Sequence, residues 1–168
     1  ILGIEVPERA KFIRVITGEL HRIVDHLVCL AALLVDMGGL TNYWYLYNPR
    51  EVVYDLLSKL TGARLTNSYV RIGGLSYDLY DGFEVDLKGC IKAVEDGVGE
   101  ALKLIEHNRI FHDRTQNVGI ITKEEAINRG LSGPNLRACG VAYDLRVNEP
   151  YYHYESFDFD IAVGSVGD

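Results

Sequence analysis

Apolar residues recur every three or four positions between Glu8 and Met37, which is the spacing of one face of an α-helix. Pro7 stands at a favoured helix start, and Gly38-Gly39 is a strong stop signal. The pattern predicts a helix of about thirty residues, roughly 45 Å long at 1.5 Å per residue. A helix of this length finds an apolar partner along its whole length in a helical bundle.

The following segments predict shorter elements. The stretch LTNYWYLYNP is aromatic and turn-like, and Pro49 is expected to open a second helix that ends near Leu60, before Thr61-Gly62. A strand is expected at residues 67–72, with Gly73-Gly74 forming the turn that follows it. These elements favour a mainly α fold with a few short strands.

A third long helix is predicted at residues 83–107, where apolar residues again follow helical spacing. Its three glycines either lower its helix propensity or permit close helix packing: Gly89, Gly97 and Gly99. A short helix is expected at 108–116 and a short strand at 118–122. Thr122 and Glu125 form a capping-box pattern for a helix that ends at Gly130. The tail after Pro150 alternates aromatic and acidic residues and predicts a strand or an extended arm.

The first helix carries an ionisable stripe beside its apolar face. At 100° per residue, five side chains fall within an arc of about 100°: Glu19, Arg22, His26, Cys29 and Asp36. Glu19 and Arg22, and Arg22 and His26, are helical neighbours. Surface helices commonly carry such residues, so a solvated face is one interpretation and a functional site is the other.

Asp36 is the most informative member of this stripe. It follows nine uncharged residues, Leu27 to Val35, and Met-Gly-Gly comes directly after it. An unpaired carboxylate in a buried position costs several kcal/mol. We therefore expect Asp36 to face water or a cavity, or to have a cationic or hydrogen-bonding partner.

Composition narrows the possible functions. The chain has 168 residues, which suit one domain, and a net charge of −7 argues against nucleic-acid binding. No apolar segment approaches the ~20 residues of a membrane-spanning helix, and no signal-peptide pattern is recognised. The chain starts without Met and ends on SVGD, so we expect a single domain, residues 1–168, that is a fragment of a longer subunit.

Cysteine and histidine spacing gives no sign of a metal site. The three cysteines lie far apart without a CxxC pair, which favours a reduced compartment and buried thiols: Cys29, Cys90 and Cys139. The five histidines lack metal-ligand spacing. Arg137 and Arg146 could hold an anion, although pairing with neighbouring carboxylates such as Asp144 is the better interpretation.

Longer segments carry a collinear family resemblance. They are LGIEVPERAKFIRVITGELHRIVDHL, DMGGLT, PREVVYDLLSKLTGARLTNSYVRIGG, FHDRTQNVGI and GLSGPNLRACGVAYDLRVNEPY. Together these segments resemble the middle part of the D subunit of NADH-quinone oxidoreductase, respiratory complex I. The resemblance implies the long-helix bundle that this family shares with the [NiFe] hydrogenase large subunit.

The resemblance implies a role in forming the quinone-reduction chamber beside the terminal iron–sulfur cluster of a partner subunit. By its position in LLVDMGG, Asp36 corresponds to a carboxylate that pairs with a His upstream of this segment. Asp36 and His26 are the candidate catalytic residues, and Glu19 and Arg22 extend the polar network.

The resemblance also implies a second candidate site. Arg71, Gly73 and Gly74, in RIGG, are expected to lie near the partner's cluster. Some family members have a His two residues after the glycine pair, and this chain has Ser76 there. Without that imidazole, the cluster potential is expected to depend less on pH.

The implied activity is that of an NADH:quinone oxidoreductase subunit, inactive as an isolated fragment. NAD binding, electron transport, quinone binding and proton translocation belong to the whole complex. No cofactor or metal is expected on this segment; quinone is the substrate, and flavin and iron–sulfur clusters lie on partner subunits. The expected partners are other peripheral-arm subunits and the membrane arm, with the chain peripheral on the cytoplasmic side of the cell membrane.

Two alternatives share this fold. One is the large subunit of a membrane-bound energy-converting [NiFe] hydrogenase, whose nickel-binding CxxC pairs would lie outside this segment. The other is the equivalent subunit of F420H2 dehydrogenase. The segments TGARLTNSYVRIGG and GVAYDLR favour the complex I family over these two alternatives.

Overall fold

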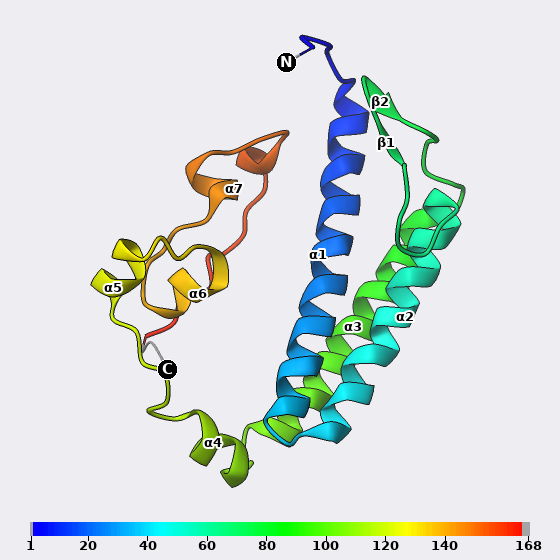
Figure 1. Ribbon diagram of the computed structural model, residues 1–168. Coiled ribbons are helices and arrows are strands. Elements are labelled where there is room, and N and C mark those ends of the chain that lie inside the picture. The colour runs from blue at the N-terminus through cyan, green and yellow to red at the C-terminus, as the bar shows by residue number, and fades with distance from the viewer. Residues whose placement is uncertain (1, 166–168) are drawn as a thin grey trace. The chain divides into compact units, whose positions relative to one another are not determined.

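The computed structural model describes residues 2–165, and the chain forms two compact units, Ile1–Phe111 and His112–Asp168. The first unit contains three long helices and a small hairpin, and the second contains short helices joined by loops (Figure 1). The predicted mainly α fold is confirmed, because the described residues contain one two-stranded sheet and are otherwise helical or irregular. The single-domain organisation expected from the sequence stays a prediction.

Helix α1 spans Glu8–Asp36 and has 29 residues, as its periodicity predicts. The helix ends at the glycine pair Gly38-Gly39. Gly38 has a φ of 90°, and the Gly39 N–H donates to the Leu34 carbonyl at 2.7 Å. A glycine reaches this left-handed backbone region without steric cost, so the helix stops where the sequence indicates.

Helix α2 spans Leu40–Thr61, so the prediction of a turn-like aromatic segment before Pro49 was wrong. Within that segment Leu46 is buried, and the rings of Tyr43 and Tyr47 stack with centroids 3.9 Å apart. Pro49 removes one backbone donor, but core burial and stacking of neighbours four positions apart compensate for it. The helix ends at Gly62, which has a φ of 79°.

Helix α3 spans Phe83–Ile105 and lies beside α2, which in turn packs against α1 (Figure 1). Two apolar clusters fill the bundle. One surrounds Leu57 and Cys90, and the other surrounds Leu27 and Ala31. The predicted long-helix bundle is therefore present in the first unit.

The predicted strand at 67–72 is shorter in the structure. Strand β1, Val70–Arg71, pairs antiparallel with β2, Gly74–Leu75. The two-residue loop between them contains Gly73, whose φ of 80° suits the third position of a type II turn.

The second unit contains most of α4 (Arg109–Thr115) and all of α5 (Lys123–Asn128), α6 (Gly133–Ala138), α7 (Leu145–Asn148) and the 3₁₀ helix Tyr154–Ser156. The predicted capping box is confirmed, since Thr122 and Glu125 bond reciprocally at the start of α5. Residues 118–122 form no strand, and neither do the described residues of the tail. Tyr154 is buried and its ring contacts Tyr151, so aromatic packing replaces strand pairing there.

Two further features concern accessibility. No helix among residues 2–165 combines the length and apolar character needed to cross a membrane. The cysteine prediction holds for Cys90, which is buried, but not for Cys29, which is exposed, or Cys139, which is half-buried. Cys29 lies on the ionisable side of α1, away from the core clusters.

The glycines of α3 differ in their surroundings. A Cβ atom built on Gly97 would lie 2.7 Å from Pro49 Cγ and 2.7 Å from the Tyr45 carbonyl oxygen. That oxygen is the helical acceptor that the missing Pro49 N–H would have used. Gly97 therefore permits close approach of α2 and α3 at the proline. Gly89 and Gly99 have open space at the same atom.

We predict that Gly97→Ala lowers the free energy of unfolding by about 1–3 kcal/mol, because the added methyl forces the two helices apart. Gly99→Ala is the matched control and should raise it by about 0.5–1 kcal/mol through helix propensity. Urea unfolding of both variants provides the measurement. Equal stabilities for the two variants would contradict the close-approach interpretation.

Candidate functional site

The ionisable stripe of α1 lies on the side opposite the residues that enter the core. Leu20, Leu27 and Ala31 are buried, whereas His26 and Asp36 are exposed. Glu19 and Arg22 are half-buried. Burial of the apolar face thus leaves the polar face of the helix away from α2 and α3.

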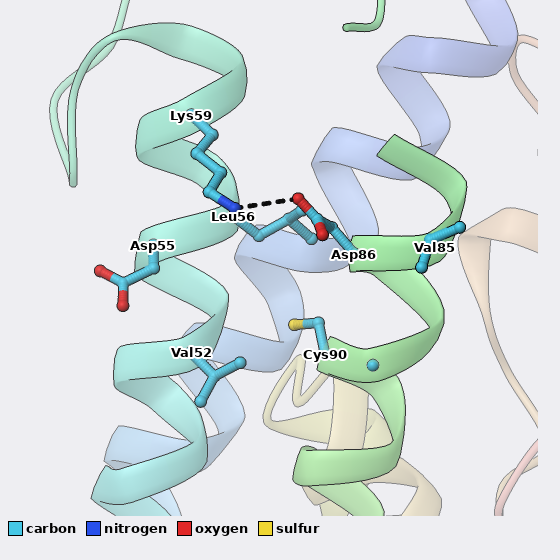
Figure 2. A pocket seen from close by; sticks show the side chains of 8 residues that line it. Val52, Asp55, Leu56, Lys59, Val85, Asp86 and Cys90 are labelled. Atoms are coloured by element: carbon cyan, nitrogen blue, oxygen red, sulfur yellow. Dashed lines mark hydrogen bonds and ion pairs between the residues drawn. The ribbon is translucent and has the colours of Figure 1, made fainter. Parts of the chain in front are cut away.

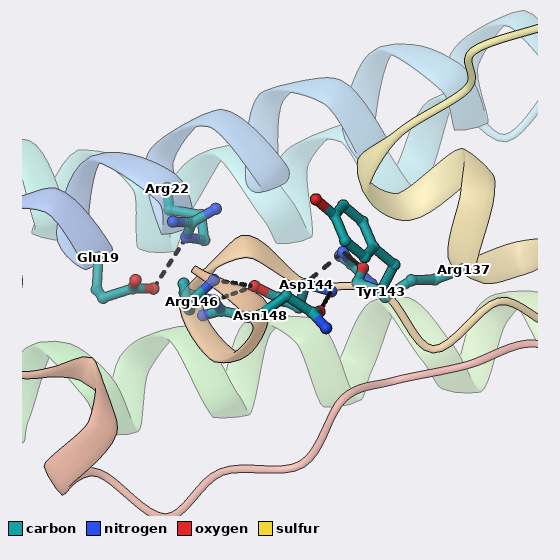
Figure 3. A network of polar contacts seen from close by, with 7 residues as sticks. All are labelled: Glu19, Arg22, Arg137, Tyr143, Asp144, Arg146 and Asn148. Atoms are coloured by element: carbon teal, nitrogen blue, oxygen red, sulfur yellow. Dashed lines mark hydrogen bonds and ion pairs between the residues drawn. The ribbon is translucent and has the colours of Figure 1, made fainter. Parts of the chain in front are cut away.

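Glu19 and Arg22 form an ion pair within α1, with Arg22 Nε 3.0 Å from Glu19 Oε2 (Figure 3). Their spacing of three residues places them as neighbours on the helix surface. Both side chains retain substantial exposure, so the pair contributes at most about 0.5 kcal/mol to stability. The pair holds two opposite charges at a defined place on α1.

His26 and Asp36 are not brought together. Ten residues separate them, which is about 15 Å along the helix axis. Within the described part of the chain, neither forms a hydrogen bond or an ion pair with another side chain. The pairing of Asp36 with a His upstream of this segment stays a prediction.

Asp36 occupies the last position of α1, where the helix macrodipole is negative, and no basic residue lies in the last turn. A carboxylate is disfavoured there. This placement is therefore electrostatically unfavourable for the helix.

The second predicted site, around RIGG, is a hairpin held against α1 by arginines. Arg14 Nη2 donates to the carbonyl oxygens of Arg71 at 2.7 Å and Gly74 at 2.9 Å. Arg9 pairs with Asp78 at 3.0 Å beyond the hairpin. The sequence analysis missed Arg14, because its partners lie 57 and 60 positions away and no local pattern marks it.

Arg71 itself is exposed, and its Nε donates to Ser76 Oγ at 2.9 Å. Together with Gly73, but without Gly74, it borders an open hollow of about 660 Å³. The other lining residues are mostly apolar and include Leu2, Ile4 and Ile72. The structure thus brings Arg71 and Gly73 together with an apolar surface.

A groove of about 240 Å³ lies between α2 and α3 and contains none of the predicted site residues (Figure 2). At its edge Lys59 bonds Asp86 at 3.0 Å, and the Tyr80 hydroxyl donates to the same carboxylate. Burial and that bond raise the pKa of Tyr80 to about 12. Burial also raises the pKa of the Cys90 thiol, so this cysteine is a poor nucleophile.

The second unit contains a buried carboxylate with two arginines. Asp144 accepts hydrogen bonds from Arg146 at 2.8 and 3.0 Å and lies 3.6 Å from Arg137 (Figure 3). The predicted pairing of these arginines with Asp144 is confirmed. Because the Arg146 bonds favour the ionised form, the pKa of Asp144 falls to about 2.

Among residues 2–165, no group of three or more His, Cys, Asp or Glu side chains is arranged to hold a metal ion.

For the hairpin, we predict that Gly73→Ala destabilises the protein by about 1 kcal/mol or more, because an L-residue is strained at its positive φ. The new methyl would also lie 3.4 Å from Ile4 Cγ2. Gly74→Ala is the matched control, since Gly74 has open space and no positive φ. Thermal unfolding compares the two, and a smaller loss for Gly73→Ala would refute the assignment.

For the Asp144 cluster, we predict a stability contribution that depends on pH. The pKa is lower in the folded chain than the ordinary 3.8, so the contribution is present above pH 3.8 and is lost as the pH falls towards 2. Its size is about 2 kcal/mol, from the difference in pKa. Urea unfolding should show that the loss of unfolding free energy in Asp144→Asn, relative to the unchanged protein, becomes smaller between about pH 5 and pH 2. The exposed Asp158→Asn serves as control, and a pH-independent deficit would count against the pairing.

The chain matches known proteins along its length. The family model described as the respiratory-chain NADH dehydrogenase 49 Kd subunit matches residues 36–168. The D subunit of NADH-quinone oxidoreductase from Methylacidiphilum infernorum is 50% identical over 168 residues, which are 100% of this chain and 40% of that protein. Its counterpart from Desulforamulus reducens is 48% identical, covering 100% of this chain and 46% of that protein. The C/D subunit from Bdellovibrio bacteriovorus is 44% identical, covering 100% and 30%.

The chain thus spans less than half the length of these relatives. The family model nevertheless covers well over half of the chain, including Asp36 and the whole RIGG hairpin. This chain belongs to the 49 kDa subunit family of the respiratory-chain NADH dehydrogenase, whose relatives include the D subunits of NADH-quinone oxidoreductases.

Proposed function

We propose that this chain forms part of the quinone-reduction chamber of a proton-translocating NADH-quinone oxidoreductase, beside the terminal iron–sulfur cluster of a partner subunit. Family membership supports the complex, because the relatives carry the name of its D subunit. The observation that carries the chamber assignment is the accessible ionisable face of α1, with Asp36 at its end.

Asp36 is the proposed proton-network residue. Its carboxylate is exposed, stands at the unfavourable end of the helix dipole, and has no side-chain partner within residues 2–165. A protonated histidine upstream of this segment would be stabilised by the Asp36 carboxylate, and the carboxylate would be stabilised by the imidazolium in return. When that histidine gives its proton to the reduced quinone, Asp36 loses its cationic partner and becomes free to pair again.

Glu19, Arg22 and His26 extend this network along α1. The Glu19–Arg22 pair supplies two fixed opposite charges, and His26 supplies an exposed imidazole. Reduction of one quinone to quinol takes two electrons and two protons. In the proposal, the electrons come from the partner's cluster and the protons come through side chains on this face.

The hairpin provides the proposed contact with the cluster-bearing subunit. Arg71 is exposed and positively charged, and apolar Val70 and Ile72 beside it are exposed too. Exposed apolar groups around an arginine are typical of a protein interface. Ser76 stands where the family resemblance implies a histidine in some members, so the group that bonds Arg71 is a hydroxyl and not an imidazole.

The remaining assignments follow from membership of such a complex. The proposed partners are the other peripheral-arm subunits and the membrane arm, and the location is the cytoplasmic side of the cell membrane. Quinone is the proposed substrate, with flavin and clusters held by partners. The family match and the relatives favour this function over a [NiFe] hydrogenase or an F420H2 dehydrogenase subunit.

We predict that Asp36→Asn in the full-length subunit lowers quinone reductase activity of the assembled complex by at least about tenfold, since proton transfer groups typically contribute about 10²–10⁴-fold. Stability of the subunit should stay equal or rise by a few tenths of a kcal/mol, because a charge is removed from the negative end of α1.

The matched control is Asp81→Asn, which removes the same charge from an exposed position outside α1. Its activity should equal that of the unchanged complex. Unchanged turnover by Asp36→Asn in an intact complex would rule out the proposed role.

A further inference from the structure

The Arg71 side chain is held by a short chain of hydrogen bonds. Arg71 Nε donates to Ser76 Oγ at 2.9 Å, and that hydroxyl donates to the Ser68 carbonyl oxygen at 3.0 Å. The Ser76 backbone N–H donates to the Tyr69 carbonyl at 2.8 Å. The hydroxyl is therefore fixed through both its backbone and its own donor bond, and it presents an acceptor to the arginine.

The main chain of Arg71 is held independently. Arg14 donates to the carbonyl oxygens of Arg71 and Gly74, which face each other across the turn. Arg14 comes from α1, so the hairpin is tied to the most extensive helix of the bundle. One arginine thus fixes the backbone of Arg71, and one serine fixes its side chain.

Arg71 retains donors for another molecule. A guanidinium has five N–H donors, and only the Nε donor is used by Ser76. No carboxylate within residues 2–165 forms an ion pair with Arg71. The exposed side chain of Ile72, at 78%, and the apolar hollow beside it lower the local dielectric when a partner covers them.

We propose that Ser76 is a positioning residue that holds the Arg71 guanidinium in one orientation towards a negatively charged group of a neighbouring subunit. This inference rests on the proposed function, which makes that group the partner's iron–sulfur cluster. Reduction makes a cluster more negative, so a cation held nearby stabilises the reduced form and raises its potential. A mobile guanidinium would raise the cluster potential less, because it spends time farther from the cluster.

The test uses the assembled complex with the full-length subunit. Ser76→Ala removes the acceptor, Ser76→Thr keeps it, and Ser68→Ala is the matched control because only the main-chain oxygen of Ser68 is used. Arg71→Gln removes the cation. Cryo-electron microscopy reports the position of the Arg71 guanidinium, and a redox titration followed by electron paramagnetic resonance reports the cluster's midpoint potential.

In Ser76→Ala we expect the Arg71 guanidinium to leave its position and the potential to fall. The fall should be smaller than in Arg71→Gln, and Ser76→Thr and Ser68→Ala should match the unchanged complex in both measurements. Two results would overturn the positioning role. One is a guanidinium that stays in place in Ser76→Ala, and the other is a Ser68→Ala variant that shows the same changes as Ser76→Ala.

Failure of the proposed function would give a different result. If Arg71→Gln leaves the potential unchanged, Arg71 does not act on the cluster, and that part of the proposed function is wrong. The position of the guanidinium in Ser76→Ala then still decides whether Ser76 holds Arg71. A potential that falls in Arg71→Gln but not in Ser76→Ala supports the cluster assignment and refutes the inference about Ser76.

Discussion

Burial of the apolar face of α1 is the interaction on which the first unit depends. Ile13, Leu20, Val24, Leu27 and Ala31 all enter the two core clusters, so one side of a 29-residue helix is fixed against its neighbours. A helix cannot rotate about its axis without exposing such a stripe, which would cost about 25 cal/mol per Å² of apolar surface. The opposite side, with Glu19, Arg22, His26 and Asp36, is accessible as a direct consequence.

The close contact between α2 and α3 is the second constraint. Pro49 leaves a carbonyl without its helical donor, and Gly97 lets the neighbouring helix approach this point. A feature that looks unfavourable in each helix alone is therefore accommodated by the pair. The bundle thereby keeps α2 continuous through a proline.

The hairpin shows how a small element acquires a fixed structure. Two strands of two residues each are too short to be stable alone. Arg14 bonds both carbonyls at the turn, and Arg9 pairs with Asp78 beyond it. Long-range polar contacts thus replace the core that a larger sheet would have. They leave Arg71 in a defined place on the surface.

The sequence by itself determined the features whose causes are local. Helical periodicity located α1 and α3, a glycine of positive φ ended α1, and the Thr122–Glu125 pattern began α5, since side-chain period and capping depend on neighbours a few positions apart. The ionisable stripe could also be predicted from the sequence, because its angular position on the helix follows from residue spacing alone. The residues of several longer segments indicated the family, because hydrophobic periodicity alone does not distinguish one family from another.

Only the tertiary structure decided what depends on distant residues. Residues 40–49 are helical because Leu46 is buried in the core, a contact that local turn propensity does not reveal. Residues 118–122 form no strand, since a strand needs a partner and none lies beside them in the described chain. The Arg14 bonds to the hairpin join residues 57 and 60 positions apart, and the Ser76 bond to Arg71 exists only after the turn has formed. Such contacts arise from the packed fold, because they require backbone segments that the sequence separates to be placed side by side.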